Sequence, residues 1–92
     1  MIFDDTYRTR DGSTHYSFGF EERGDGTWRV HILSQPSYGS RSDSLHNTHR
    51  LTDSEGYYIC WDSEITSVKD AKRVASLWAE KTQEYIRTGR RF

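Results

Sequence analysis

The side chains in this sequence that are best suited to catalysis or metal binding are four histidines and one cysteine. His46 and His49 stand three positions apart in the segment LHNTHR, and His31 and Cys60 lie elsewhere. Imidazole nitrogens and a thiolate are zinc ligands, and imidazoles also act as general acids and bases. Which of these reactions is open to them depends on the elements that position them.

The segment LHNTHR is predicted to be a strand, because LHNTHRL and YYICW flank a TDSEG loop in the manner of a β-hairpin. On a strand an odd separation sends two side chains to opposite faces, whereas helix positions i and i+3 share a face. His46 and His49 should therefore not bind the same metal ion.

A second arrangement of these residues is a His2Cys site. If Thr52 pairs with Tyr57, His49 lies opposite Cys60, and His31 could join them from a neighbouring strand. The run YYICW is apolar on both sides of the strand, which makes Cys60 typical of a small buried residue. We therefore predict no metal and no cofactor.

Acid–base catalysis is an alternative for the same residues. A small ribonuclease needs little more than two positioned imidazoles, or a His and a Glu, with an Arg to hold the phosphate; His31, His49, Arg29 and Arg50 are candidates. Histidine, arginine and threonine are also ordinary on the solvent side of a sheet. The chain contains no GxSxG elbow, Walker loop or Rossmann fingerprint, so a binding function is favoured over catalysis.

Composition narrows the classes of partner. Ninety-two residues form a single domain, 1–92, and 13 aromatic side chains concentrate its hydrophobicity. Thirteen Lys and Arg against 14 Asp and Glu leave a net charge of −1, without the basic excess of proteins that bind nucleic acid mainly through phosphates. One cysteine excludes an internal disulfide, so a disulfide-stabilised secreted scaffold is not expected.

Neither a signal peptide nor a membrane span is predicted. The segment MIFDDTYRTR has no apolar core, and no run of apolar residues approaches the length that crosses a bilayer. We therefore expect a cytoplasmic protein without membrane contact, or one in the host cytoplasm if it is encoded by a phage.

The clearest element is a C-terminal helix over residues 67–88. Its apolar positions follow a 3.6-residue period, Ser67 and Asp70 resemble a capping box, and Gly89 suits the left-handed residue that ends a helix. We expect its Trp and Ala stripe to face the core.

A β-hairpin is predicted from HYSFGFEE and TWRVHILS. A three-residue loop, 24–26, pairs Phe20 with Val30 and Phe18 with Ile32, which gathers the large apolar side chains on one face. The other face then carries Glu21 opposite Arg29 as an ion pair, with His31 beside them.

The predicted fold class is α+β: an antiparallel meander sheet of four to five strands packed against one long C-terminal helix. An edge strand at residues 2–9 and a polar connection at 35–44 complete it. The predicted core comprises Phe18, Phe20, Trp28, Val30, Ile32, Ile59, Trp61, Ala71, Val74, Trp78 and Ile86.

The order of elements resembles two families. A three-stranded sheet followed by a helix, with GDGTWRV at the hairpin and TSVKDAKRVASLW opening the helix, is similar to the AP2-like arm-binding domains of phage integrases and to HicB-type antitoxins. The integrase resemblance implies sheet residues in the major groove of DNA. The chain departs from both families by about 25 additional residues before YYICW, and from the integrase domains by its neutral charge.

From these observations we expect a small non-enzymatic module that binds another macromolecule, with a protein as the expected partner, as accessory or inhibitory proteins of phages and mobile elements do. Its surface would combine the polar sheet face with the 35–44 loop, because Tyr and Arg are enriched at binding hot spots. The candidate residues are Arg29, His31, Tyr38, Arg41, His49 and Arg50. The alternatives are a nucleic-acid-binding domain that presents Arg and His from the sheet, and the ribonuclease above; monomer and homodimer both stay open.

Overall fold

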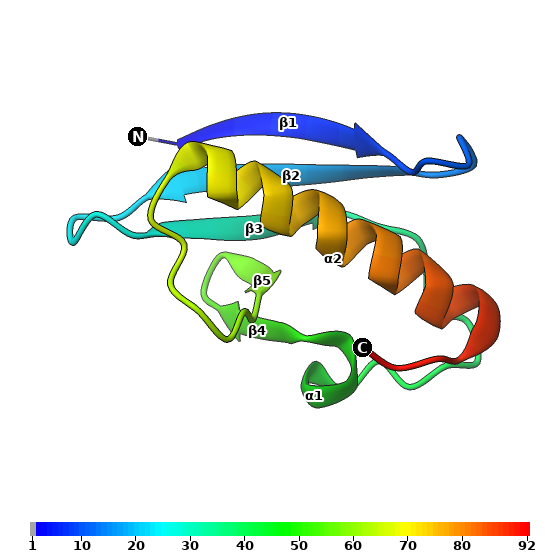
Figure 1. Ribbon diagram of the computed structural model, residues 1–92. Helices are drawn as coiled ribbons and strands as arrows, with labels where there is room; N and C mark the ends of the chain where they lie inside the picture. Colours follow the sequence, from blue (N-terminus) through cyan, green and yellow to red (C-terminus); the bar gives the residue numbers. More distant parts are fainter. Residues whose placement is uncertain (1) are drawn as a thin grey trace.

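The computed structural model describes residues 2–92, which form one five-stranded sheet and one long helix (Figure 1). The elements in chain order are β1 Ile2–Arg8, β2 His15–Glu22, β3 Trp28–Ser34, α1 Leu45–Thr48, β4 Arg50–Asp53, β5 Gly56–Ile59 and α2 Val68–Thr88. The α+β class and the antiparallel sheet under a C-terminal helix are confirmed.

The sheet order is β1-β2-β3-β5-β4, so the sequential meander stops at β3. The last hairpin joins the sheet through its second strand, with Tyr58 opposite His31, and β4 lies at the edge. Composition explains why β5 rather than β4 pairs with β3, because the polar strand RLTD suits an exposed edge better than the more apolar strand β5 does.

The predicted β2–β3 register is confirmed: Phe20 pairs with Val30 and Phe18 with Ile32. Gly26 ends the connecting loop at φ 87°, the left-handed conformation that this register requires. The rule that set the register was burial, since a shift by one residue would move both phenylalanines to the solvent side.

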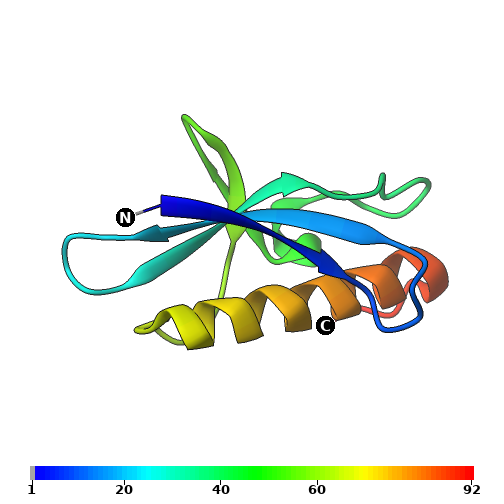
Figure 2. The ribbon, with the colours of Figure 1, turned by 90° about the horizontal axis from the view of Figure 1, so that it is seen from above.

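Helix α2 forms as the sequence pattern predicts. The Ser67 side chain accepts a hydrogen bond from the Asp70 N–H, and Gly89 closes the helix at φ 79° with its N–H donated to the Tyr85 carbonyl. The helix lies across one face of the sheet and leaves the other face uncovered (Figure 2). Within residues 2–92, no helix is both long enough and apolar enough to cross a membrane.

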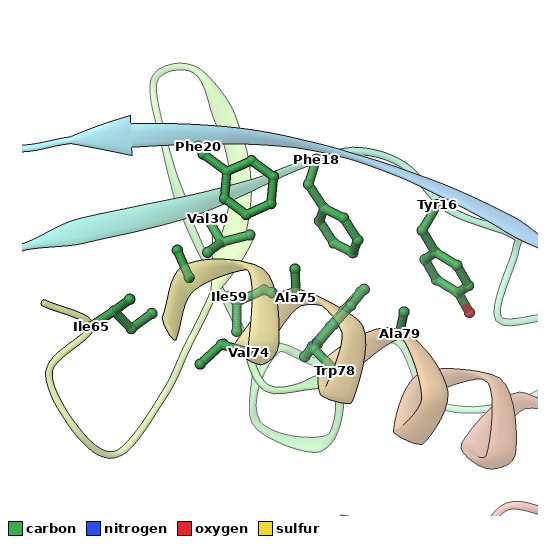
Figure 3. Packing of buried hydrophobic residues seen from close by; sticks show 11 residues of the cluster. Tyr16, Phe18, Phe20, Val30, Ile59, Ile65, Val74, Ala75, Trp78 and Ala79 are labelled. Carbon is green, nitrogen blue, oxygen red and sulfur yellow. The ribbon is translucent and has the colours of Figure 1, made fainter. Parts of the chain in front are cut away.

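The core lies between α2 and the sheet, and its central residue is Trp78 (Figure 3). The Trp78 indole is fully buried and meets the rings of Tyr16 and Phe18 edge-on, at centroid distances of 6.0 Å each. Its N–H donates to the Thr48 carbonyl across 3.1 Å. One side chain thus joins α2, β2 and α1.

Most of the predicted core is confirmed, with some corrections. Four predicted members, Trp28, Ile32, Trp61 and Ile86, are only partly buried. The buried hydrophobic residues that the sequence analysis omitted are Tyr16, Tyr38, Ile65, Ala75, Ala79 and Tyr85. Ala75 and Tyr85 lie on the apolar stripe of α2 that was expected to face the core, although they were not named among the core residues. Tyr16 and Tyr38 were missed because a polar hydroxyl weakens the signal of a ring that is nonetheless buried.

The prediction that LHNTHR is a strand is wrong. Leu45–Thr48 form a single helical turn, α1, with Ser44 as its N-cap, and His49 follows in the left-handed conformation at φ 53°. The Ser44 side chain accepts from the Asn47 N–H, and the Thr48 hydroxyl donates to the Ser44 carbonyl. These local hydrogen bonds compete successfully with extended structure, and β4 begins only at Arg50.

Replacement of Trp78 tests the core. We expect Trp78→Ala to lower the free energy of unfolding by about 3 to 5 kcal/mol, because it removes a buried indole and leaves a cavity. Urea unfolding monitored by circular dichroism measures the loss. Lys69→Ala on the exposed side of α2 is the control and should change stability little. A Trp78→Ala variant as stable as the parent would contradict the packing described above.

Candidate functional site

The sheet surface opposite α2, here called the outer face, carries the strongest candidate site. Strand register places the side chains of alternate residues on it. Those that matter here are Ile2, Glu21, Arg29, His31, Leu33, Leu51, Asp53 and Tyr58. The β4–β5 hairpin rises away from the sheet on this same side (Figure 2), so the outer face has a raised edge.

Arg29 lies at the junction between the flat part of the sheet and the raised hairpin. Its guanidinium stacks on the Tyr58 ring at 3.9 Å and donates to Asp53 across 2.9 Å. The predicted ion pair with Glu21 is wrong, although the two residues are in the predicted register. A flat aromatic ring and a carboxylate from the hairpin together offer the guanidinium a better-defined position than one flexible glutamate does.

Asp53 is itself fixed by the turn that follows it. The Glu55 N–H donates to its carboxylate, and this bond, followed by the charge of Arg29, holds the pKa of Asp53 below its ordinary value. Arg29 therefore faces an ionised partner at neutral pH.

His31 is buried, with 5% of its surface exposed, which corrects the prediction that it lies on a solvated face. Its Nε2 makes a 2.8 Å hydrogen bond with Glu21, which also pairs with Arg23 at 3.3 Å. The Tyr58 ring covers His31 edge-on at 6.3 Å. The hydrogen bond from His31, and then the nearby positive charges, lower the pKa of Glu21.

A groove of about 410 Å³ opens beside Arg29. Its origin is the short contact between β3 and β5, which pair at His31 and Tyr58 and then separate. The chain returns to β3 only at Ile65, whose carbonyl accepts from the Trp28 N–H across 2.7 Å. Trp28, Tyr58 and Trp61 line the opening, so the groove offers aromatic surface next to a fixed guanidinium.

Large apolar side chains stand exposed around these polar groups. The exposed fraction is 60% for Ile2, 53% for Leu33 and 42% for Leu51. Leu51 pairs with Tyr58 on β5, and Leu33 extends over Gly19 on β2. The outer face therefore combines exposed apolar side chains with fixed polar groups.

The six predicted binding residues do not form one site. Arg29 and His31 share the outer face, whereas Tyr38 and Arg50 lie together on the other side of the β4–β5 hairpin. Arg50 is 7% exposed, so its predicted exposure is wrong, and Tyr38 is buried as well. Arg41 donates to the carbonyls of Ile86 and Arg87 in the last turn of α2. The negative end of the helix dipole favours a cation at this position.

His49 belongs to a third place, next to the C-terminal segment. Its ring stacks on Phe92 at 4.3 Å, and its Nε2 is hydrogen-bonded to the Phe92 carbonyl. The predicted proximity to Cys60 is confirmed by the backbone, since the Cys60 N–H donates to the His49 carbonyl. His31 is instead hydrogen-bonded to Glu21, and among residues 2–92 no group of three His, Cys, Asp or Glu side chains is placed to hold a metal ion.

Comparisons of this chain with protein-family models, with curated proteins and with solved structures found no match. The outer face is therefore identified as a candidate site from its geometry alone.

Sequence reasoning missed the tyrosines that organise these sites. Tyr57 and Tyr58 are neighbours on β5, so they point to opposite faces, and each stacks on a different arginine: Tyr57 on Arg50 at 4.1 Å and Tyr58 on Arg29. Alternation in YYICW was a usable signal for the two faces. The partner arginines were not predictable, because they come from distant parts of the chain.

The Glu21–His31 bond predicts a pH dependence of stability. A carboxyl whose pKa is lowered on folding stabilises the protein above its unfolded pKa, and the contribution is lost as the pH falls through the folded value. At neutral pH the free energy of unfolding should therefore be larger for the parent than for the Glu21→Gln variant. We expect this difference to narrow as the pH drops below 4.5, the ordinary value for Glu21, and to vanish in stronger acid.

Urea unfolding at several pH values measures the difference. Glu22→Gln is the matched control, because its side chain is exposed and makes no hydrogen bond or ion pair within the part of the chain that the structure describes. A stability difference for Glu21→Gln that stays constant from neutral pH to strong acid would contradict the assignment.

Proposed function

We propose that this protein is a non-enzymatic binding module whose outer face docks onto another protein. The observation that carries the proposal is the uncovered sheet face, where exposed Leu33 and Leu51 flank the stacked pair of Arg29 and Tyr58. Exposed apolar side chains around fixed polar groups favour a partner that is itself partly apolar. The aromatic groove beside Arg29 can accept a protruding side chain of that partner.

The charges of the outer face support a protein partner over nucleic acid. Arg29 is paired with Asp53, and Arg23 is paired with Glu21. A phosphate backbone would have to compete with these carboxylates, and the negative net charge of the chain adds no long-range attraction. A protein surface, by contrast, can complement paired charges at the rim of an apolar contact.

Capture from a lysate of the native host, repeated with surface variants, tests the proposal. We expect a partner retained by the parent to bind Leu33→Asp and Leu51→Asp at least about tenfold more weakly, because each change buries an unpaired charge in the contact. The matched control is Val68→Asp, since Val68 is a similarly exposed apolar residue at the start of α2. An acidic residue there also suits the helix N-terminus.

Circular dichroism and thermal unfolding first establish that all three variants are folded. The proposal fails if every captured protein binds the two outer-face variants as tightly as it binds the parent. It also fails if Val68→Asp alone removes binding, which would place the contact on α2.

A salt titration with duplex and single-stranded DNA and RNA distinguishes a nucleic-acid-binding function from the proposed protein-binding function. We expect no retention of any of these by the parent at 150 mM salt, because the arginines of the outer face are already paired. Fluorescence anisotropy is the measurement. Tight binding that weakens steeply with added salt and is lost in Arg29→Gln would replace the proposal by a nucleic-acid function.

A further inference from the structure

The charges of the outer face restrict the kind of surface that can cover it. Arg29 is paired with Asp53, and Arg23 is paired with Glu21, so these groups already have partners within one chain. A partner with a strong charge of either sign would have to compete with one of these pairs. The surface that fits best is one whose own charges are paired and whose exposed contact groups are partly apolar.

The outer face of a second copy of this chain is such a surface. It presents the exposed apolar side chains of Ile2, Leu33 and Leu51 beside the paired charges. Register also places Asp4 and Arg8, one charge of each sign, on this face of β1. Two outer faces therefore approach each other without the repulsion that faces of a single sign would meet.

The shape of the outer face selects how two copies fit together. The raised β4–β5 hairpin occupies one edge of the sheet, β1 occupies the other edge, and β3 is the central strand (Figure 2). A two-fold axis across the strands would bring both raised hairpins to the same edge of the interface. An axis along β3 instead places each hairpin over the flat β1–β2 edge of the other copy.

We infer that the partner of the outer face is a second copy of this chain, related by a two-fold axis along β3. The inference rests on the function proposed above, because it uses the same face. Rotation about an axis along a strand keeps each residue at its position along that strand, so Leu33 meets Leu33 of the second copy. Leu51 reaches from the raised hairpin over β1 of the second copy, the strand that carries Ile2. The two sheets then pack in the aligned arrangement.

The size of the outer face predicts a weak dimer. Neighbouring strands lie about 4.8 Å apart and rise about 3.3 Å per residue, so five strands, the longest of eight residues, form a face of roughly 500 Å². Two such faces bury roughly 1,000 Å² in total, which is at the lower limit for a specific interface. We therefore expect a dimer that dissociates on dilution.

Sedimentation equilibrium of the full chain from about 10 μM to about 1 mM protein tests the inference. The parent should change from monomer to dimer across this range. Leu33→Asp and Leu51→Asp should dimerise at least about tenfold more weakly, because each places an unpaired charge in the interface. The matched control is Val68→Asp, which should dimerise as the parent does because Val68 is exposed on α2.

A single engineered thiol tests the position of the axis. In a Cys60→Ser background, Leu33→Cys leaves one thiol per chain, and a disulfide between copies requires their Cα atoms to approach within about 7 Å. We expect Leu33→Cys to form covalent dimers under mild oxidation, measured on non-reducing gels. Val68→Cys in the same background is the control and should form far fewer. Circular dichroism establishes that all variants are folded.

The inference is overturned if the parent stays monomeric at about 1 mM, if Leu33→Asp dimerises as tightly as the parent, or if Val68→Asp alone dissociates the dimer. Leu33→Cys that crosslinks no more than Val68→Cys would overturn the axis along β3. A monomeric parent that captures a host protein through Leu33 and Leu51 would exclude a second copy and leave the docking function of the outer face standing. A monomeric parent without any such partner would remove both.

Discussion

The buried indole of Trp78 is the interaction on which the packing of α2, β2 and α1 depends. Its ring fills the space between α2 and β2, and its N–H is donated to the Thr48 carbonyl. That one hydrogen bond fixes the end of α1 against the core. The same residue, Thr48, then holds Arg50 through its hydroxyl. Thr48 thus connects the Trp78 side chain to Arg50, which lies between the Tyr38 and Tyr57 rings.

The parts of the fold that the sequence predicted correctly are those in which neighbours along the chain decide the outcome. The 3.6-residue stripe of α2 and its caps at Ser67 and Gly89 depend on nearby residues, and the β2–β3 register follows from placing Phe18 and Phe20 on one face. Each of these choices is made within one continuous segment, residues 67–89 for the helix and residues 15–34 for the hairpin, where the periodic pattern is informative.

The parts that were predicted wrongly depend on partners from elsewhere. LHNTHR looked extended because its flanks suggested a hairpin, but a Ser44 cap and the Thr48 bond to Trp78 stabilise a helical turn instead. Arg50 was expected on the surface because a charged residue on a short strand is usually solvated. Tyr38, 12 positions away in a loop without regular structure, covers it, and no pattern in the sequence indicates that contact.

Strand alternation couples the two arginine–tyrosine stacks while keeping them on opposite faces of β5. Tyr57 and Tyr58 share one peptide bond, yet the first stacks on Arg50 and the second on Arg29. A one-residue slip of β5 would exchange the two rings and disrupt both stacks at once, so the register of this short hairpin is specified from both faces.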